Sequence, residues 1–264
     1  MSRPIKRPNP LPALYRWRTN LLQAPLFCLG TIFCGSLSLL FSLWDKNGHQ
    51  QHAIARLWAR FSLLTSFSPL RVLGKENLAA CPVAVYASNH TSYMDTPVIF
   101  RALPFQFCIL ARTQLWAIPF IGWYLNRSGQ LPIDTSNPRA TIASLGNAVK
   151  ILKKGMSVFV FPEGGRTPNG KLKPFLSGAA FLAIRAQVPL VPMALHGVYD
   201  LLPQHTHHFY PGRLTLSVGK PIPTTGLNHH DAEALTEQLR QAIQALYDAI
   251  EAPATESIES TVSA

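Results

Sequence analysis

Acidic residues and cysteine pairs are what this 264-residue sequence has least of. Charged residues make up 14% of the chain and hydrophobic residues 47%, whereas soluble domains usually carry roughly 25% charged residues. This composition excludes an intrinsically disordered protein and suggests contact with a membrane. None of the four cysteines belongs to a C-x-x-C pair, which argues against a disulfide scaffold or zinc site and favours a reducing compartment: Cys28, Cys34, Cys81 and Cys108.

The 13 acids are unevenly distributed along the chain. Seven lie in residues 231–264 beside a single base, Arg240, which leaves 23 bases and six acids in residues 1–230. A body with this charge attracts anions such as phospholipid headgroups, nucleic acid or phosphorylated small molecules. Because acids are so scarce there, each one calls for a reason: Asp45, Glu76, Asp95, Asp134, Glu163 and Asp200.

Residues 1–20 form a basic, proline-rich tail, and an uncharged run follows from Thr19 to Trp44. As a helix rising about 1.5 Å per residue, residues 21–44 would reach about 36 Å, which exceeds a bilayer core of about 30 Å. The run is longer than the apolar part of a signal peptide, and no A-x-A cleavage site closes it. It therefore predicts a membrane segment.

A second N-terminal stretch, residues 53–67, has Arg56 and Arg60 on one helical face and apolar side chains mostly elsewhere. That pattern is typical of a helix lying in a membrane interface. We expect residues 21–68 to form a membrane-embedded helical pair that dips into one leaflet and returns; a single span and a buried core helix are the alternatives. The anchoring side chains would be Leu21, Phe27, Phe33, Leu40, Trp44, Trp58 and Phe61.

Residues 69–251 alternate short apolar runs with helical periodicity, which predicts an α/β domain with a mixed sheet flanked by helices. Strands are expected at residues 83–88, 107–111, 130–133, 157–161, 190–195 and 214–218. Helices are expected at 137–154, 177–187 and 231–250, the last with Asp231 available as its cap. Residues 252–264 are polar, and we expect a disordered tail.

The first candidate site follows the strand VAVYAS directly, at His90. Sheets of α/β proteins bind ligands at the carboxyl ends of their strands. Asp95 would reach the imidazole if a tight turn led into a helix. The pair would then act as a base, with His90 taking a proton and Asp95 fixing the tautomer. In the alternative, Asp95 only caps the next helix and His90 is a packing residue.

The second candidate site is FPEGGRT, residues 161–167, which follows the strand SVFVF. Gly164 and Gly165 allow the backbone to approach a ligand closely. Arg166 could hold a phosphate with two hydrogen bonds, so this segment is a candidate anion site. A tight loop with a surface ion pair is the alternative.

Taken with the segments around Arg112 and Val188, these two sites resemble the sequence blocks of the glycerolipid acyltransferase family. Asn89-His90-x4-Asp95 is similar to its NHxxxxD block and residues 161–167 to its FPEGTRS block, and the order of the blocks agrees over about residues 75–200. The resemblance implies a glycerol-3-phosphate acyltransferase-like fold. It also implies transfer of a fatty acyl group from acyl-CoA or acyl carrier protein to the free hydroxyl of lysophosphatidate, giving phosphatidate.

The resemblance also implies roles for individual residues. His90 would be the general base on the acceptor hydroxyl, with Asp95 as its partner. The phosphorylated acceptor would contact Glu163, Gly164, Arg166 and Arg112, the last standing where the family usually has a lysine. A thioester is already activated, so we expect no metal and no cofactor beyond the acyl donor itself.

The sequence departs from the family pattern at two expected cations. Thr135 stands where arginine is common, and residues 175–178 lack the lysine often found before Gly178. Another lysophospholipid or a lyso-aminolipid therefore remains an alternative acceptor. An alternative of another class is a non-enzymatic protein that binds anionic lipids.

The expected partners are the lysolipid, the acyl donor and an anionic membrane surface. We expect no nucleic acid, because the basic tail lacks interleaved aromatic residues and precedes an apolar segment. His205, His207 and His208 have no nearby carboxylate and suggest a solvated loop rather than a metal site. The expected location is a membrane, the inner membrane in a bacterium, with the active site on the cytoplasmic side.

Overall fold

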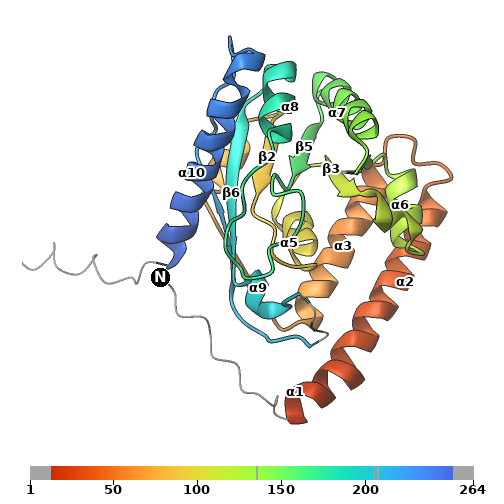
Figure 1. Ribbon diagram of the computed structural model, residues 1–264. Coiled ribbons are helices and arrows are strands. Elements are labelled where there is room, and N and C mark those ends of the chain that lie inside the picture. The colour runs from red at the N-terminus through yellow and green to blue at the C-terminus, as the bar shows by residue number, and fades with distance from the viewer. Residues whose placement is uncertain (1–12, 135, 205, 207, 252–264) are drawn as a thin grey trace, which may run out of the picture.

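The computed structural model of the protein describes residues 13–134, 136–204, 206 and 208–251 (Figure 1). The first twelve residues of the basic tail and the tail at 252–264 lie outside the described residues. So do Thr135 and two members of the histidine cluster, His205 and His207. The predictions made for these positions therefore stay predictions.

Seven strands form one mixed sheet in the order β1-β7-β6-β2-β5-β3-β4. All neighbouring strands are parallel except β6 and β7, which are antiparallel. The six predicted strands are confirmed to within two residues at each end, whereas β1 was not predicted. The strands are β1 Leu70–Leu73, β2 Val85–Ser88, β3 Phe107–Arg112, β4 Leu131–Ile133, β5 Ser157–Val160, β6 Leu190–His196 and β7 Leu214–Val218.

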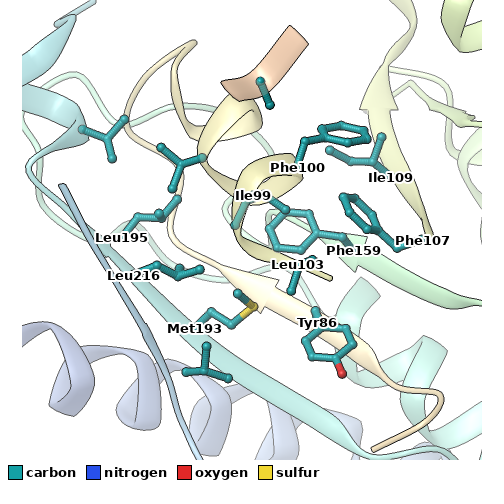
Figure 2. Close-up of a cluster of buried hydrophobic side chains, with 14 of the residues drawn as sticks. Tyr86, Ile99, Phe100, Leu103, Phe107, Ile109, Phe159, Met193, Leu195 and Leu216 are labelled. Carbon is teal, nitrogen blue, oxygen red and sulfur yellow. The ribbon is translucent and has the colours of Figure 1, made fainter. Parts of the chain in front are cut away.

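Helices cover both faces of the sheet, because successive strand side chains point in opposite directions. Tyr86 and Phe159 face a core shared with α3 (His49–Thr65) and α5 (Asp95–Ala102), part of which is drawn in Figure 2. Their neighbours Val85 and Val158 face the other core, under α7 (Pro138–Lys153), α8 (Gly178–Ala186) and α10 (Ala232–Glu251). We call these the α3–α5 face and the α7–α10 face.

The three predicted helices of the α/β domain are confirmed as α7, α8 and α10, and their starts show how the sequence sets their limits. Asn137 caps α7 by accepting a hydrogen bond from the Ala140 N–H at 3.2 Å. The expected cap of α10 is corrected. Asn228 caps the short 3-10 turn η3 (His229–Asp231), and Asp231 completes a capping box by accepting from the Asn228 N–H. The shorter elements are α4 Glu76–Ala79, η2 Thr113–Ala117, α6 Ile121–Arg127 and α9 Val198–Leu201.

The N-terminal segment is one long helix built from α1 (Ala13–Arg18), a π-helical turn η1 (Thr19–Gln23) and α2 (Ala24–Phe41). Within the described residues, its part Tyr15–Phe41 is the one helix long and apolar enough to cross a membrane. The chain then turns back into α3, which runs beside α2 and also packs on α5 (Figure 1). Insertion of this helical pair into a leaflet stays a prediction.

The predicted anchoring side chains fall into two groups. Phe27, Trp58 and Phe61 are half-buried and pack against other parts of the protein, and their contact with lipid stays a prediction. Phe27 and Trp58 pack against each other and against the α3–α5 core. The Phe61 ring lies directly over Gly30 of α2. The other four side chains are 52–67% exposed on the N-terminal helix and the turn after it: Leu21, Phe33, Leu40 and Trp44.

Candidate active site

The strand order explains how distant segments meet. β5 lies between β2 and β3, and all three strands are parallel. Their carboxyl ends therefore lie at one edge of the sheet, which we call the carboxyl edge. The loop with His90 follows β2, the segment 161–167 follows β5, and Arg112 ends β3. The two clusters that sequence analysis singled out are thus brought together.

His90 and Asp95 form the close pair that the motif predicts. The His90 Nδ1 and the Asp95 Oδ2 lie 2.8 Å apart. Asp95 is in the first turn of α5 and fully buried, and its Oδ2 also accepts the backbone N–H groups of Thr91 and Ser92 at 2.6 and 2.9 Å. A buried carboxylate with three donors around one oxygen stays a good acceptor, so it holds the imidazole with its proton on Nδ1.

The remaining nitrogen of His90, Nε2, hydrogen-bonds to none of the residues that the structure describes. The imidazole stacks on the Phe161 ring with 3.9 Å between centroids and 13° between planes. Its side chain is 19% exposed, so one edge of the ring is reachable from outside. An imidazole oriented through Nδ1 and open at Nε2 can take a proton from a bound hydroxyl.

Asn89, which precedes His90, connects this loop to β6, the strand beside β2 in the sheet. Its side chain donates to the Leu195 carbonyl oxygen at 2.9 Å and accepts the Leu195 N–H at 2.7 Å. The two hydrogen bonds imitate a strand pairing with β6 and fix the start of the His90 loop. Sequence reasoning assigned Asn89 no role, although its place directly before His90 was a signal.

Glu163 is 5% exposed and faces the His90 loop. Its Oε1 accepts the His90 backbone N–H at 2.8 Å, and its Oε2 accepts the Lys173 backbone N–H at 3.2 Å. Burial raises the pKa of this carboxyl to about 7, while the two N–H donors and the Lys173 charge oppose that shift. These contacts give Glu163 a positioning role; its contact with an acceptor substrate stays a prediction.

The two glycines after Glu163 keep the loop tight. Gly164 has φ +66°, and a Cβ there would come within 2.8 Å of the Leu176 side chain. A Cβ on Gly165 would lie 4.0 Å from both the Arg112 guanidinium and the Lys173 ammonium group. Two cations therefore gather at the bare Gly165 backbone, where the Lys173 Nζ also donates to the Glu163 and Gly165 carbonyl oxygens.

A third cation lies on the same edge. The Arg166 guanidinium carbon is 3.5 Å from the centroid of the Tyr93 ring, in the loop after His90. Across the described ranges, Arg112, Arg166 and Lys173 have no carboxylate within salt-bridge distance. Unpaired cations on the loops after β3 and β5 form a suitable site for a phosphate group.

An apolar cavity of about 110 Å³ lies between α2, α3, α5 and α6. Two of its lining residues are direct neighbours of site residues, since Thr96 follows Asp95 and Ala111 precedes Arg112. Trp58, Phe100 and other apolar side chains make up most of its wall. Nowhere in the part of the chain that the structure describes do three metal-ligating side chains converge.

Comparisons with known proteins agree with this geometry. The family model described as Acyltransferase matches residues 69–196. The chain is 34% identical to 1-acyl-sn-glycerol-3-phosphate acyltransferase BAT2, chloroplastic, from Brassica napus over 186 residues, covering 70% of this chain and 53% of the relative. It is 30% identical to the Saccharomyces cerevisiae 1-acyl-sn-glycerol-3-phosphate acyltransferase, covering 83% and 74%.

The chain spans about half the length of the plant relatives that it matches. A crystal structure shares the fold: that of the 1-acyl-sn-glycerophosphate acyltransferase PlsC from Thermotoga maritima, with a TM-score of 0.77 and 24% identity. The match covers 90% of this chain and 98% of that one. The predicted α/β fold, a mixed sheet flanked by helices, is thereby confirmed, whereas the membrane-embedded helical pair stays a prediction.

Proposed function

The chain belongs to the acyltransferase family, and on that premise we propose that it is a membrane-associated 1-acylglycerol-3-phosphate acyltransferase. It transfers a fatty acyl group from an acyl thioester to the free hydroxyl of lysophosphatidate and forms phosphatidate. The single observation that carries the proposal is the His90–Asp95 pair, 2.8 Å apart and beside cations that lack carboxylate partners.

The reaction requires one proton transfer and one acyl transfer. The His90 Nε2 takes the proton of the acceptor hydroxyl while the hydroxyl oxygen attacks the thioester carbonyl carbon. The new C–O bond forms, the C–S bond breaks, and the departing sulfur receives the proton from His90. Asp95 stabilises the imidazolium between these steps. The thioester is activated beforehand, so the reaction needs no metal or further cofactor.

The acceptor phosphate binds at the cations of the carboxyl edge. Arg112 and Arg166 are the residues that family resemblance selects, and Lys173 supplies a third positive charge beside Gly165. Lys173 compensates for the cations that are missing at Thr135 and between residues 175 and 178. Glu163 positions the His90 loop and the segment at Lys173 by accepting hydrogen bonds from their backbone N–H groups.

The acyl chain and the membrane meet on the α2–α3 side. The apolar cavity beside Thr96 and Ala111 has the chemistry that a fatty chain requires. The exposed apolar side chains of the N-terminal helix attach the protein to an anionic membrane, with the active site on the cytoplasmic side.

The test is acyl transfer by the purified protein across a panel of acceptors. Palmitoyl-CoA or palmitoyl acyl carrier protein is mixed with lysophosphatidate, lysophosphatidylcholine or glycerol 3-phosphate, and thiol release and lipid product are both measured. We expect lysophosphatidate to have the highest kcat/KM. Absence of transfer to every acceptor would reject the enzyme and leave an anionic-lipid-binding protein.

One observation favours a second candidate acceptor. Leu176, in the segment that lacks the family lysine, is 55% exposed beside Gly164. A headgroup with fewer negative charges than a phosphate monoester would suit such a site. In competition assays, a lysophospholipid or lyso-aminolipid that outcompetes lysophosphatidate would replace the substrate proposed above.

A further inference from the structure

The outer side of α7 carries an unusual charge pattern. This helix of 16 residues has no acidic residue, and its exposed side chains include Arg139, Lys150 and Lys153, followed directly by Lys154. Within the residues that the structure describes, none of these four cations is in a salt bridge. Among the described residues, their one side-chain hydrogen bond runs from the Lys150 Nζ to the Asn147 Oδ1 at 3.4 Å. These cations are therefore available to an external partner.

The position of α7 separates it from the predicted membrane surface. Its buried side chains Ala148 and Leu152 belong to the core of the α7–α10 face, whereas α2 and α3 lie over the opposite face. α7 and the α2–α3 pair therefore cover opposite faces of the sheet. α7 begins just after β4, so Arg139 lies near the carboxyl edge that holds Arg112, His90 and Asp95. Lys150, Lys153 and Lys154 lie about 16–22 Å further along, at the end of the helix that precedes β5.

Charge is divided within the α7–α10 face itself. α10 carries Glu233, Glu237, Asp248 and Glu251, and its one base, Arg240, pairs with Glu237 at 2.7 Å. α8 lies between the two helices and contacts both. The positive charge of α7 attracts an acidic partner, and the negative charge of α10 repels it. The two helices together would therefore orient the partner on the α7–α10 face.

An apolar residue lies within the basic stripe. Ile142 of α7 is 66% exposed, and Leu176, just before the neighbouring α8, is 55% exposed. Exposed apolar side chains inside a charged rim are typical of protein–protein contacts. The stripe from Arg139 to Lys153 extends about 21 Å along the helix, which is longer than a single phosphate group requires.

We propose that this α7 surface, formed by Arg139, Ile142, Lys150, Lys153 and Lys154, docks an acyl carrier protein through an acidic surface of the carrier. A carrier that lies along the helix from Lys154 to Arg139 presents its acyl thioester from the Arg139 end, where α7 begins at the carboxyl edge. The inference rests on the proposed acyl transfer and deepens it by naming the kind of donor. The observations favour a protein over coenzyme A because the stripe is long and combines charge with Ile142.

The test compares two donors in matched variants of the full chain. Lys150→Glu/Lys153→Glu reverses two charges of the α7 surface. Lys75→Glu/Lys220→Glu makes the same change at exposed positions after β1 and β7, at the far side of the sheet. For each protein, kcat/KM is measured with palmitoyl acyl carrier protein and with palmitoyl-CoA, and binding of fluorescent acyl-free carrier protein is measured by anisotropy.

We expect the α7 variant to lose at least ~10-fold in kcat/KM and in affinity for the carrier protein while changing less than ~2-fold with palmitoyl-CoA. The control variant should match the wild type with both donors. A Lys150→Gln/Lys153→Gln protein should show a smaller loss with the carrier, which separates charge reversal from a general effect on the helix.

Three outcomes overturn the docking surface: unchanged carrier binding, an equal loss with both donors, or release of the variant from phosphatidylglycerol vesicles, which would assign the surface to lipid. The two proposals also fail separately. Carrier binding without acyl transfer supports docking and rejects the proposed function. Transfer from palmitoyl-CoA without carrier binding keeps the function and rejects docking.

Discussion

Most proteins bury apolar side chains and expose carboxyl groups. The N-terminal helix departs from the first rule, and the carboxyl edge of the sheet departs from the second. The helix presents Leu29 and Phe33 to the outside at 62% and 63% exposure. The carboxyl edge, in contrast, buries two carboxyl groups, Asp95 and Glu163. An exposed apolar surface is stable when lipid or protein covers it, and a buried carboxyl is stable when donors surround it. The first region therefore has the properties of an attachment surface, and the second has those of a reaction site.

The largest expected effect is a loss of acyl transfer without a loss of membrane binding. His90→Ala removes the base and should lower kcat by at least ~10²-fold, because no other described group occupies the place of its Nε2. Vesicle binding, measured by flotation, should match that of the wild type. If the variant transfers acyl groups at the wild-type rate, His90 is not the base. If the variant no longer floats with the vesicles, His90 also contributes to membrane binding.

The second prediction concerns Glu163 and the pH dependence of stability. Its pKa is about 7 in the folded protein against an ordinary 4.5, so the stability linked to its protonated form is complete below about 4.5 and is lost as pH rises through 7. Relative to Glu163→Gln, the wild type should lose up to about 3 kcal/mol of unfolding free energy over this range. Denaturant titrations at several pH values measure the difference.

Exposed Glu237 on α10 is the control for that measurement. Hydrogen bonds from Arg240 and Gln241 lower its pKa to about 2. Its linked stability is present above pH 4.5 and declines as pH falls, so Glu237→Gln should give a small effect of opposite sign. Parallel pH curves for the wild type and Glu163→Gln would contradict the buried state of Glu163.

The third prediction compares two apolar residues of similar exposure, Leu29 on the N-terminal helix and Ile142 on α7. Leu29→Ser should reduce partition into anionic vesicles by about 10-fold, because burying one leucine is worth roughly 1.5–3 kcal/mol. Ile142→Ser on α7 changes a residue of similar exposure and should leave partition unchanged. Equal effects of both changes would mean that attachment is not confined to the N-terminal helix.

The fourth prediction concerns the proposed phosphate site. Arg166→Ala removes a cation that stacks on Tyr93 and should raise the acceptor KM by about 10-fold, as for a lost charged hydrogen bond. The donor KM should change less than ~2-fold. Steady-state kinetics with each substrate varied in turn measure both values. If only the donor KM rises, the acceptor phosphate binds at another part of the carboxyl edge.

The sequence predicted the strands well where they are apolar and buried. β1 was missed because LRVL includes the exposed Arg71 and is not fully buried, as expected of an edge strand that pairs with β7 alone. The His90–Asp95 contact was predictable because both residues lie within one turn. The bond from the His90 N–H to Glu163 was not, because it depends on β2 and β5 being neighbours, and strand order is not encoded in local patterns.

The N-terminal helices show a second limit of sequence reasoning. Apolar periodicity identifies which side chains avoid water. It does not show whether such a side chain packs against lipid or against the rest of the protein. Phe33 and Phe27 satisfy the same pattern, yet Phe33 is exposed and Phe27 packs on Trp58 and Phe209. The same limit applies to Lys173, whose approach to Gly165 requires the loop after β5 to fold back.

The reversed direction of β1 and β7 has a practical consequence. The loops that follow these two strands lie at the edge of the sheet opposite to His90 and Asp95, and Lys75 and Lys220 are exposed there. A cysteine introduced at position 220, after replacement of the exposed Cys28, would carry a dye at the edge of the sheet opposite to His90 and Asp95. Such a reporter could follow landing and departure of single molecules on a supported membrane during turnover.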